Sequence, residues 1–123
     1  MTAQEIGAKL VSLCQQRKNT ESIRTLYAPN VESIEARTPP SGPRVVHGKD
    51  AVLSKNEEFM RHHDIHKIDV VGPFPHGDDR FAVRFYYDVT NKLTGEQMKM
   101  EEIGVFTVEG DKVVREEFFY QAN

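Results

Sequence analysis

Helical and strand-like patterns occupy separate parts of this chain. In the first half, apolar residues recur at the spacing of a helix, whereas from Ile65 onward they alternate with polar residues. Consecutive strands joined by short turns pair as an antiparallel sheet, and helices gathered before them cover one of its faces. The order of patterns therefore predicts an α+β fold with the helices packed on one face of an antiparallel sheet.

Three helices and five strands are expected. The helices are predicted over residues 3–17, 21–27 and 49–63, with Thr20 as the N-cap of the second. The strands are predicted over residues 31–36, 65–71, 81–90, 97–108 and 112–120. Residues 38–43 include three prolines, which cannot donate a backbone hydrogen bond to a sheet, so this segment is expected to be a loop.

Composition narrows the class of protein. The 123 residues are 38% hydrophobic and 28% charged, which predicts one folded, soluble domain spanning residues 1–123. A net charge of −3 with scattered basic residues makes nucleic acid an unexpected partner, and no apolar run is long enough to cross a membrane. The single cysteine, Cys14, excludes an internal disulfide, and together with the lack of an export signal it favours the cytoplasm.

Three segments carry a family resemblance. They are Ile-Arg-Thr-Leu-Tyr-Ala-Pro-Asn-Val at residues 23–31, Val-His-Gly-Lys-Asp-Ala-Val at 46–52, and the closing strands around 105–114. With the order of elements, they resemble the cone fold of the nuclear transport factor 2-like superfamily, which includes SnoaL-like cyclases and ketosteroid isomerases. The resemblance implies N-terminal helices in the concave face of a curved sheet, a small-molecule pocket between them, and commonly a homodimer formed through the sheets.

The catalytic groups of ketosteroid isomerases are not matched. In those enzymes an aspartate is the base, and a tyrosine and a protonated aspartate stabilise the oxyanion. By resemblance, the tyrosine position falls near Val11, the base near Ala36 and the oxyanion aspartate near Gly104. Steroid isomerisation by that mechanism is therefore disfavoured, although Glu35 supplies a base if the strand is shifted by one residue.

Alternation along the last two strands selects a candidate pocket face. With Phe106 taken as inward, Met100, Glu102 and Gly104 share its face. A three-residue turn at 109–111 sets Gly104 opposite Glu116, and brings residues 114, 116, 118 and 120 to the same side. In this register Glu102 and Glu116 are diagonal neighbours about 8 Å apart.

Two carboxyl groups in one apolar chamber favour proton-transfer chemistry. Desolvation and a like charge both raise the pKa of a carboxyl group, which suits a general acid or base near neutral pH. In the alternative interpretation, one or both glutamates pair with Lys99, Arg115 or a histidine, or a two-residue turn directs them outward. The expected catalytic candidates are Glu102, Glu116, His66 and Tyr120, and the expected ligand-binding residues are Met100, Phe106, Phe118 and His47.

The histidines give only a weak metal signal. His62, His63 and His66 fall where the third helix is expected to end, so they do not keep the regular spacing of helical metal ligands. His66 is expected to begin a strand and to face the interior, either in a hydrogen-bonding or acid/base role in the pocket or, alternatively, in a capping or surface role. We expect no metal and no cofactor.

Three functions remain open from the sequence. The chain is expected to be a small-molecule-pocket protein of the SnoaL-like class, as an acid/base isomerase, cyclase or lyase acting on a small apolar substrate. It could instead be a non-catalytic binding module for an apolar metabolite, or a dimeric docking domain with a vestigial pocket. A homodimer through the sheet is expected because the last strands carry apolar residues on both faces, with Ile103, Val105 and Phe119 opposite the pocket side.

Overall fold

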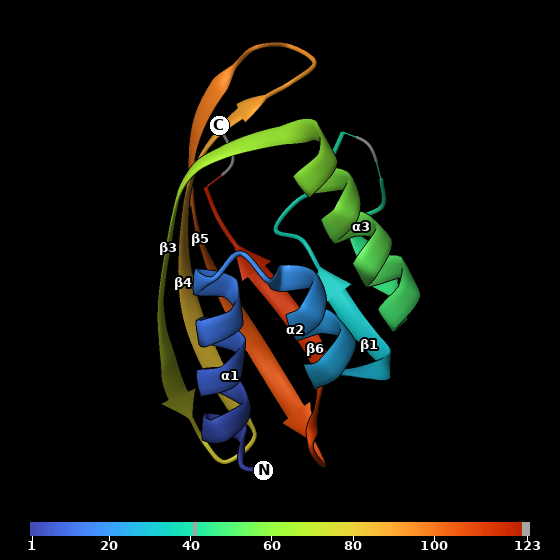
Figure 1. The fold of residues 1–123 in the computed structure, drawn as a ribbon. Coiled ribbons are helices and arrows are strands. Elements are labelled where there is room, and N and C mark those ends of the chain that lie inside the picture. Colours follow the sequence, from blue (N-terminus) through green and yellow to red (C-terminus); the bar gives the residue numbers. More distant parts are fainter. Residues whose placement is uncertain (41, 122–123) are drawn as a thin grey trace.

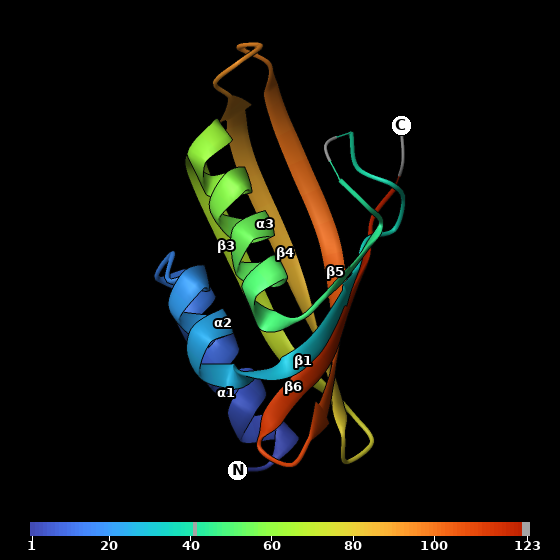
Figure 2. The ribbon, with the colours of Figure 1, turned by 90° about the vertical axis from the view of Figure 1, so that its right-hand side faces the viewer.

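Three helices lie against one face of a six-stranded sheet in the computed structural model, which describes residues 1–40 and 42–121 (Figure 1). In chain order the elements are α1 (Ala3–Gln15), α2 (Asn19–Leu26), β1 (Tyr27–Ile34), β2 (Val45–His47), α3 (Lys49–His62), β3 (His63–His76), β4 (Arg80–Asn91), β5 (Gln97–Glu109) and β6 (Lys112–Phe119). The predicted α+β fold is confirmed. Figure 2 shows the helices gathered on one side of the long, curved strands.

The sheet is mixed and not wholly antiparallel. Its strand order is β2-β1-β6-β5-β4-β3, and every neighbouring pair is antiparallel except β1 and β6. No hairpin constrains the direction of β1 and β6, because these two strands are far apart in the sequence, and they run parallel. The expectation of an all-antiparallel sheet is therefore wrong at this one pairing, which places the first strand beside the last.

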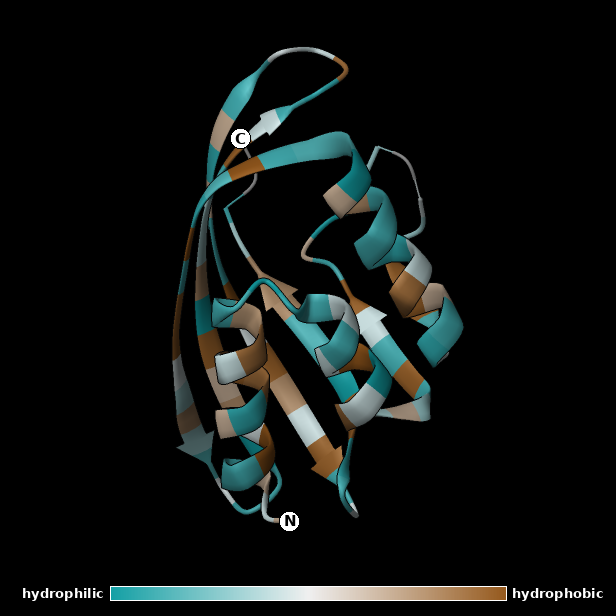
Figure 3. Cartoon of the chain, viewed as in Figure 1, coloured by the Kyte–Doolittle hydropathy of each residue, from teal (hydrophilic) through white to brown (hydrophobic). Residues whose placement is uncertain are grey.

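Helix α1 begins with a capping box. The Thr2 hydroxyl accepts a hydrogen bond from the Glu5 amide, and the Glu5 carboxylate accepts one from the Thr2 amide. Its buried positions Ile6, Leu10 and Cys14 recur every four residues, which gives the helix one apolar side (Figure 3). This amphipathic pattern is why the helix was predictable from sequence.

Helix α2 begins earlier than predicted. Its N-cap is Lys18, which makes no side-chain capping bond, and Thr20 lies inside the helix. The Thr20 hydroxyl instead accepts a hydrogen bond of 3.2 Å from Nδ2 of Asn56 on α3. The prediction of Thr20 as the N-cap is therefore wrong, because its hydroxyl links two helices.

The core forms where α1 crosses the strands. Phe81, Val83 and Phe85 alternate inward along β4, and the ring of Phe81 stacks on that of Phe106 at 5.1 Å between centroids. A Cβ atom at Gly7 would lie 2.8 Å from Cβ of Pro73, so the lack of a side chain there lets α1 approach the sheet closely.

The turn that joins β5 to β6 is shorter than predicted. Glu109 pairs with Lys112, so only Gly110 and Asp111 form the turn, and Gly110 takes a φ of 60° that favours glycine. Farther along the hairpin the register shifts, which leaves Val114 as an extra residue on β6. The predicted three-residue turn is therefore wrong.

This bulge decides what Glu116 faces. Beyond Val114, Glu116 pairs with Phe106, whereas the predicted register places it opposite Gly104. The difference is two residues, and because side chains alternate between faces, an even shift leaves Glu116 on the inner face. The expected inward orientation of Val114 is wrong, because the bulge brings buried Val113 to that side.

Candidate functional site

A cavity of about 1110 Å³ lies between the helices and the inner face of the sheet. Six of the predicted site residues line it: Met100, Glu102, Phe106, Glu116, Phe118 and Tyr120. They reach it from β5, from β6 and from the residue that follows β6. The alternation along the two strands therefore placed their inward side chains on the correct face.

His66 and His47 do not line the cavity. The pairing of β3 with β4 is irregular between Ile65 and Lys67, so the strand bulges at His66, which is exposed and bonds Oγ1 of Thr90 through Nε2 at 2.7 Å. The expected inward orientation of His66 is wrong for this reason. His47 is also exposed, with Nδ1 3.6 Å from the Glu32 carboxylate, while its neighbour Val46 faces the cavity.

Glu116 is the centre of a buried hydrogen-bond network. Its side chain is on β6, and the Tyr27 hydroxyl donates to its Oε1 atom. The Ser33 hydroxyl donates to Oε2 at 2.6 Å. Both donors come from β1, so the parallel pairing of β1 with β6 brings the three side chains together.

Burial and hydrogen bonding act on Glu116 in opposite directions. Glu116 is only 4% exposed, and desolvation raises the pKa of its carboxyl group above the usual value. Hydrogen bonds from Ser33 and Tyr27 oppose that rise because they stabilise the ionised form. Desolvation and the nearby Glu116 raise the pKa of Tyr27 well above 10.0, so this phenol keeps its proton.

Lys55 extends the network from Glu116 toward the cavity. Its Nζ atom, carried by α3, donates to Ser33 Oγ at 2.8 Å and lies 3.4 Å from Oε1 of Glu35. It also lies 5.6 Å from the centre of the Phe118 ring. We call Tyr27, Ser33, Glu35, Lys55 and Glu116 the polar floor of the cavity. Each of these side chains has at least one polar partner.

Glu102 has a different environment. It lies on β5 opposite Phe85, and its side chain is partly exposed to the cavity. Among the residues that the structure describes, no group donates a hydrogen bond to its carboxylate. Desolvation, with smaller contributions from Glu35 and Glu116, raises the pKa of Glu102 from 4.5 to about 8, against an opposing effect of Lys55.

Glu102 and Glu116 are farther apart than predicted. Glu116 pairs with Phe106, and Glu102 comes four residues before Phe106 on β5. At the rise of a strand, four residues span about 13 Å. They are therefore not diagonal neighbours, and the expected separation of about 8 Å is wrong. Glu35, which the sequence offered only as an alternative base, raises the pKa of Glu102 more than Glu116 does.

Three further polar groups reach the cavity. Tyr87 and Asn19 both line the cavity, and desolvation followed by the charge of Glu102 raises the pKa of Tyr87, while the side chain of Asn19 acts against that rise. Oδ1 of Asn19 is a buried side-chain atom without a hydrogen-bond partner. The pKa of Tyr120 is raised by desolvation and by Glu35, while the backbone amide of Arg37 acts against that rise.

The polar floor was largely missed by sequence reasoning. Tyr27 falls in the segment that carries the fold resemblance, Ser33 falls in an expected strand whose faces were not assigned, and Lys55 falls on a helix of which only the apolar positions were used. One signal was present in the expected strand over residues 31–36, where Val31, Ser33 and Glu35 occupy alternate positions. Since Val31 is apolar and fully buried, alternation would have directed Ser33 and Glu35 to the same side.

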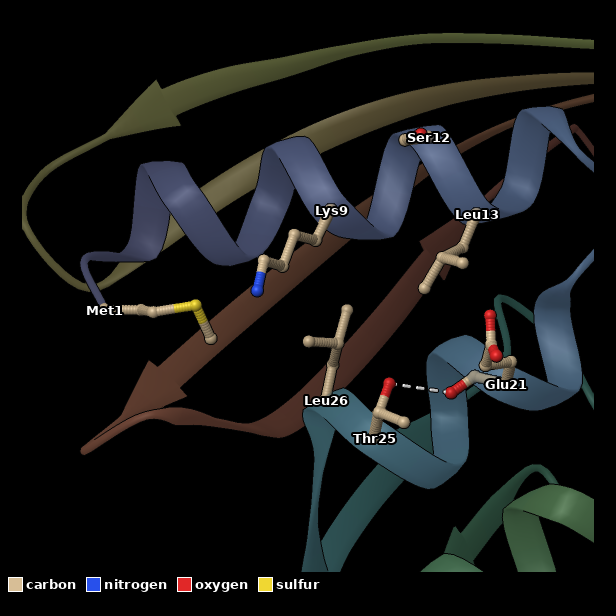
Figure 4. Close-up of a pocket in the computed structure, with 7 residues that line it drawn as sticks. All are labelled: Met1, Lys9, Ser12, Leu13, Glu21, Thr25 and Leu26. Atoms are coloured by element: carbon tan, nitrogen blue, oxygen red, sulfur yellow. Dashed lines mark hydrogen bonds between the residues drawn. The ribbon is translucent and has the colours of Figure 1, made fainter.

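A second hollow lies between α1 and α2. Figure 4 shows Lys9 and Leu13 of α1 directed toward Thr25 and Leu26 of α2, with the Thr25 hydroxyl bonded to the backbone oxygen of Glu21. None of the predicted site residues lines this groove. The candidate site is therefore the cavity over the sheet.

Within residues 1–40 and 42–121, no group of three or more histidine, cysteine, aspartate or glutamate side chains is placed to hold a metal ion. None of the helices in the described part of the chain is both long and apolar enough to cross a membrane.

The helices, the curved mixed sheet and the cavity between them define an α+β cone fold of the nuclear transport factor 2-like type. The sequence profile of the SnoaL-like domain matches residues 1–120. The chain therefore belongs to the SnoaL-like family, as the sequence resemblance predicted.

Solved structures agree with this assignment. A protein of Mesorhizobium loti, provisionally named a SnoaL-like polyketide cyclase (carbohydrate phosphatase), is 38% identical with a TM-score of 0.90, over 98% of this chain and 100% of that one. An NTF2-like protein of Burkholderia thailandensis is 17% identical, with a TM-score of 0.81 over 98% of this chain and 92% of that one. A protein of Bacillus subtilis, provisionally named an isomerase, is 16% identical, with a TM-score of 0.74 over 97% of this chain and 86% of that one. None of the curated proteins matches the chain.

Proposed function

We propose that this SnoaL-like protein is a proton-transfer enzyme that acts on a small, mainly apolar molecule bound in the cavity. Glu102 is the group that we assign to the proton transfer. The observation that carries the proposal is its environment: the carboxyl group faces the cavity, has no hydrogen-bond donor among the described residues, and has a pKa of about 8. A carboxyl group with such a pKa is able both to donate and to accept a proton near neutral pH.

The surroundings of Glu102 support this role. Met100, Phe106 and Phe118 give the cavity an apolar wall, which suits an apolar ligand and strengthens electrostatic interactions inside the cavity. The provisional names of the Mesorhizobium and Bacillus proteins, polyketide cyclase and isomerase, agree with a reaction in which protons move within one molecule.

Glu116 is assigned a positioning role. Its two oxygen atoms are already bonded to Tyr27 and Ser33, so it holds the polar floor in place and leaves Glu102 to meet the ligand. Tyr120 keeps its place as a candidate acid or hydrogen-bond donor, since it lines the same cavity. His66 and His47 have no part in this mechanism, because neither lines the cavity.

The two alternative functions predict different cavities. A vestigial pocket would be filled by side chains, and the volume of about 1110 Å³ disfavours that alternative. A pure binding module would not need a carboxyl group without a hydrogen-bond donor in its apolar wall. The carboxyl group of Glu102, which has no donor among the described residues, therefore favours the enzyme over the binding module.

The proposal is tested with 5-nitrobenzisoxazole, a small apolar probe of carboxylate bases. The base removes the ring C–H proton, that electron pair completes a nitrile, and the N–O bond breaks to give a coloured phenolate. Since the ionised Glu102 is the base, the rate should rise with pH through about 8 and then level off. Glu102→Gln should lower this rate about 100-fold, which is the usual contribution of a positioned base.

The neighbouring Glu101 supplies the matched control. Glu101 lies on the same strand but is exposed and accepts a 3.2 Å hydrogen bond from Arg84, so Glu101→Gln should leave the rate unchanged. Equal rates for the natural protein and Glu102→Gln would show that Glu102 is not the base. Probe binding without proton transfer in the natural protein would favour the binding module instead.

We also propose a homodimer that works in the cytoplasm. Val71, Ile103 and Phe119 lie on the sheet face opposite the helices, and each is at least 38% exposed. A second copy would cover this apolar surface. A reducing compartment suits Cys14, because it is buried and is the only cysteine of the chain.

A further inference from the structure

The polar groups in the cavity divide into two sets. In the polar floor, each side chain has at least one polar partner within the protein. Elsewhere in the lining of the cavity, the Asn19 Oδ1 atom is buried without a partner, and the Glu102 carboxylate receives no donor from the described residues. Buried polar atoms are rarely left unpaired, because each one costs about 1–3 kcal/mol, so an unpaired atom that faces a cavity points to a bound molecule.

Asn19 and Tyr87 present complementary groups to that molecule. Asn19 is the first residue of α2 and offers an acceptor at Oδ1, whereas Tyr87 projects from β4. The side chain of Asn19 lowers the pKa of Tyr87 as a nearby hydrogen-bond donor does, and the Tyr87 hydroxyl donates no hydrogen bond to a residue that the structure describes, so its proton is available to a ligand. Burial and the charge of Glu102 keep Tyr87 protonated, so it acts as a donor at any physiological pH.

Tyr87 and Glu102 belong to the same side of the sheet. Tyr87 pairs with Met100 and Phe85 pairs with Glu102, so Tyr87 and Glu102 are diagonal neighbours on adjacent strands, roughly 7–8 Å apart at their Cα atoms. The rings of Phe85 and Tyr87 stack 6.1 Å apart, and they give this wall an aromatic surface. A flat apolar ligand lying against it would reach Tyr87 and Glu102, and Asn19 lines the same cavity.

We propose that Asn19 and Tyr87 form a specificity subsite for a ligand group that is both donor and acceptor, such as a hydroxyl on an aromatic or alicyclic ring. The hydroxyl donates its proton to Asn19 Oδ1 and accepts one from the Tyr87 hydroxyl. The subsite rests on the proposed function, because it orients the same ligand whose proton Glu102 transfers. It adds a substrate class: a small cyclic molecule with a free hydroxyl near its reacting carbon.

The subsite is tested with two probes that share one ring system. 2-Naphthol carries a hydroxyl, and 2-methoxynaphthalene has the same rings and the same oxygen without the donor proton. Calorimetric titration near pH 6.5 should show that the natural protein binds 2-naphthol about tenfold more tightly, the effect of satisfying one buried acceptor. Asn19→Leu should reduce this ratio to about one.

Two further variants separate donor from acceptor. Tyr87→Phe removes the donor that both probes use, so both should bind more weakly and the ratio should persist. Asn56→Leu is the matched control, because Asn56 also lines the cavity but its Nδ2 atom is already bonded to Thr20. It should leave the ratio unchanged. The proposal predicts as well that the side-chain amide signals of Asn19 shift with 2-naphthol and not with its methyl ether, a measurement that needs no variant.

The possible failures are distinct. Equal binding of the two probes by the natural protein would overturn the subsite but leave the cavity and Glu102 in place. Loss of the ratio in Glu102→Leu but not in Asn19→Leu would assign the hydroxyl to Glu102 and overturn the subsite. If neither probe binds, the subsite is wrong, and the proposed function is then decided by the reaction of 5-nitrobenzisoxazole: a Glu102-dependent rate would keep it, and no such rate would overturn it.

Discussion

The Ser33 hydroxyl lies 2.6 Å from Oε2 of Glu116, in a part of the protein where both side chains are at least 96% buried. The same hydroxyl accepts a hydrogen bond from Lys55, so one serine joins two strands and a helix beneath the cavity. Groups in such a network depend on one another, because a removed partner leaves a buried polar atom without a hydrogen bond.

Replacing Ser33 should therefore weaken the fold. Ser33→Ala leaves Oε2 of Glu116 without its donor, and the expected loss is about 1–3 kcal/mol in the free energy of unfolding. Urea unfolding at pH 7 measures it. Ser54→Ala is the control, since Ser54 is exposed on α3 and should tolerate the change. Equal stability of the two variants would show that the Ser33 hydrogen bond contributes little.

Glu102 should give the stability of the protein a distinct dependence on pH. Its pKa is about 8 when folded and near 4.5 when unfolded, so between these values the unfolded chain binds fewer protons. The contribution of Glu102 to the free energy of unfolding is greatest below about pH 4.5, decreases as the pH rises, and becomes constant above about pH 8. Glu102→Gln should remove this decline, and at pH 9 it should be more stable than the natural protein by up to about 5 kcal/mol.

Unfolding by urea at several pH values tests this expectation. The Glu101→Gln variant should follow the natural protein, because Glu101 is exposed. If Glu102→Gln loses stability at pH 9, then the carboxylate is ionised and paired in the folded protein, and its proton-transfer role should be withdrawn.

The inner face of the sheet was predictable because alternation depends on few assumptions. Phe106 was a sound anchor, and it carried Met100, Glu102 and, across the hairpin, Glu116 and Phe118 to the correct side. The partners along the hairpin could not be predicted. They depend on a two-residue turn and a bulge whose combined effect on pairing is not visible in the residue pattern.

Contacts between side chains of different elements were also not predictable from the sequence. Tyr27 and Ser33 meet Glu116 only because β1 pairs in parallel with β6, and Lys55 reaches Ser33 from α3. Single-sequence periodicity gives no information on such a pairing. The predicted orientation of His66 was wrong for a local reason, because one irregularity in β3 directs its side chain to the solvent.

Association through the sheet should be measurable directly. Light scattering at micromolar concentration should give about twice the 14.1 kDa of one chain. Phe119→Arg places a charge in the exposed apolar surface and should shift the protein toward the monomer, whereas Leu93→Arg, in the turn between β4 and β5, should not. A natural protein that scatters as one chain would refute the dimer.

Gly104 should control the shape of the cavity. A Cβ atom there would lie 2.9 Å from the Phe106 ring and 3.1 Å from the Phe118 ring, closer than such atoms pack. Gly104→Val should therefore cost about 1–3 kcal/mol and weaken binding of 2-methoxynaphthalene, because the rings move into the cavity. Adding Phe118→Leu should restore part of both. Undiminished binding by the single variant would show that the rings move elsewhere.

The bulge at Val114 makes the ligand-facing side of β6 a matter of residue count. Deleting Val114 would leave Val113 opposite Val108 and Arg115 opposite Thr107 as successive pairs, so the ladder would become regular and Glu116 and Phe118 would stay on the inner face. Keeping Val114 but pairing it regularly would shift the strand by one residue and turn both side chains to the outer surface, unless the extra residue moved into the turn. Members of this family could thus exchange a longer turn for a bulge without losing the cavity, provided that the residue at position 116 stays opposite the residue at position 106.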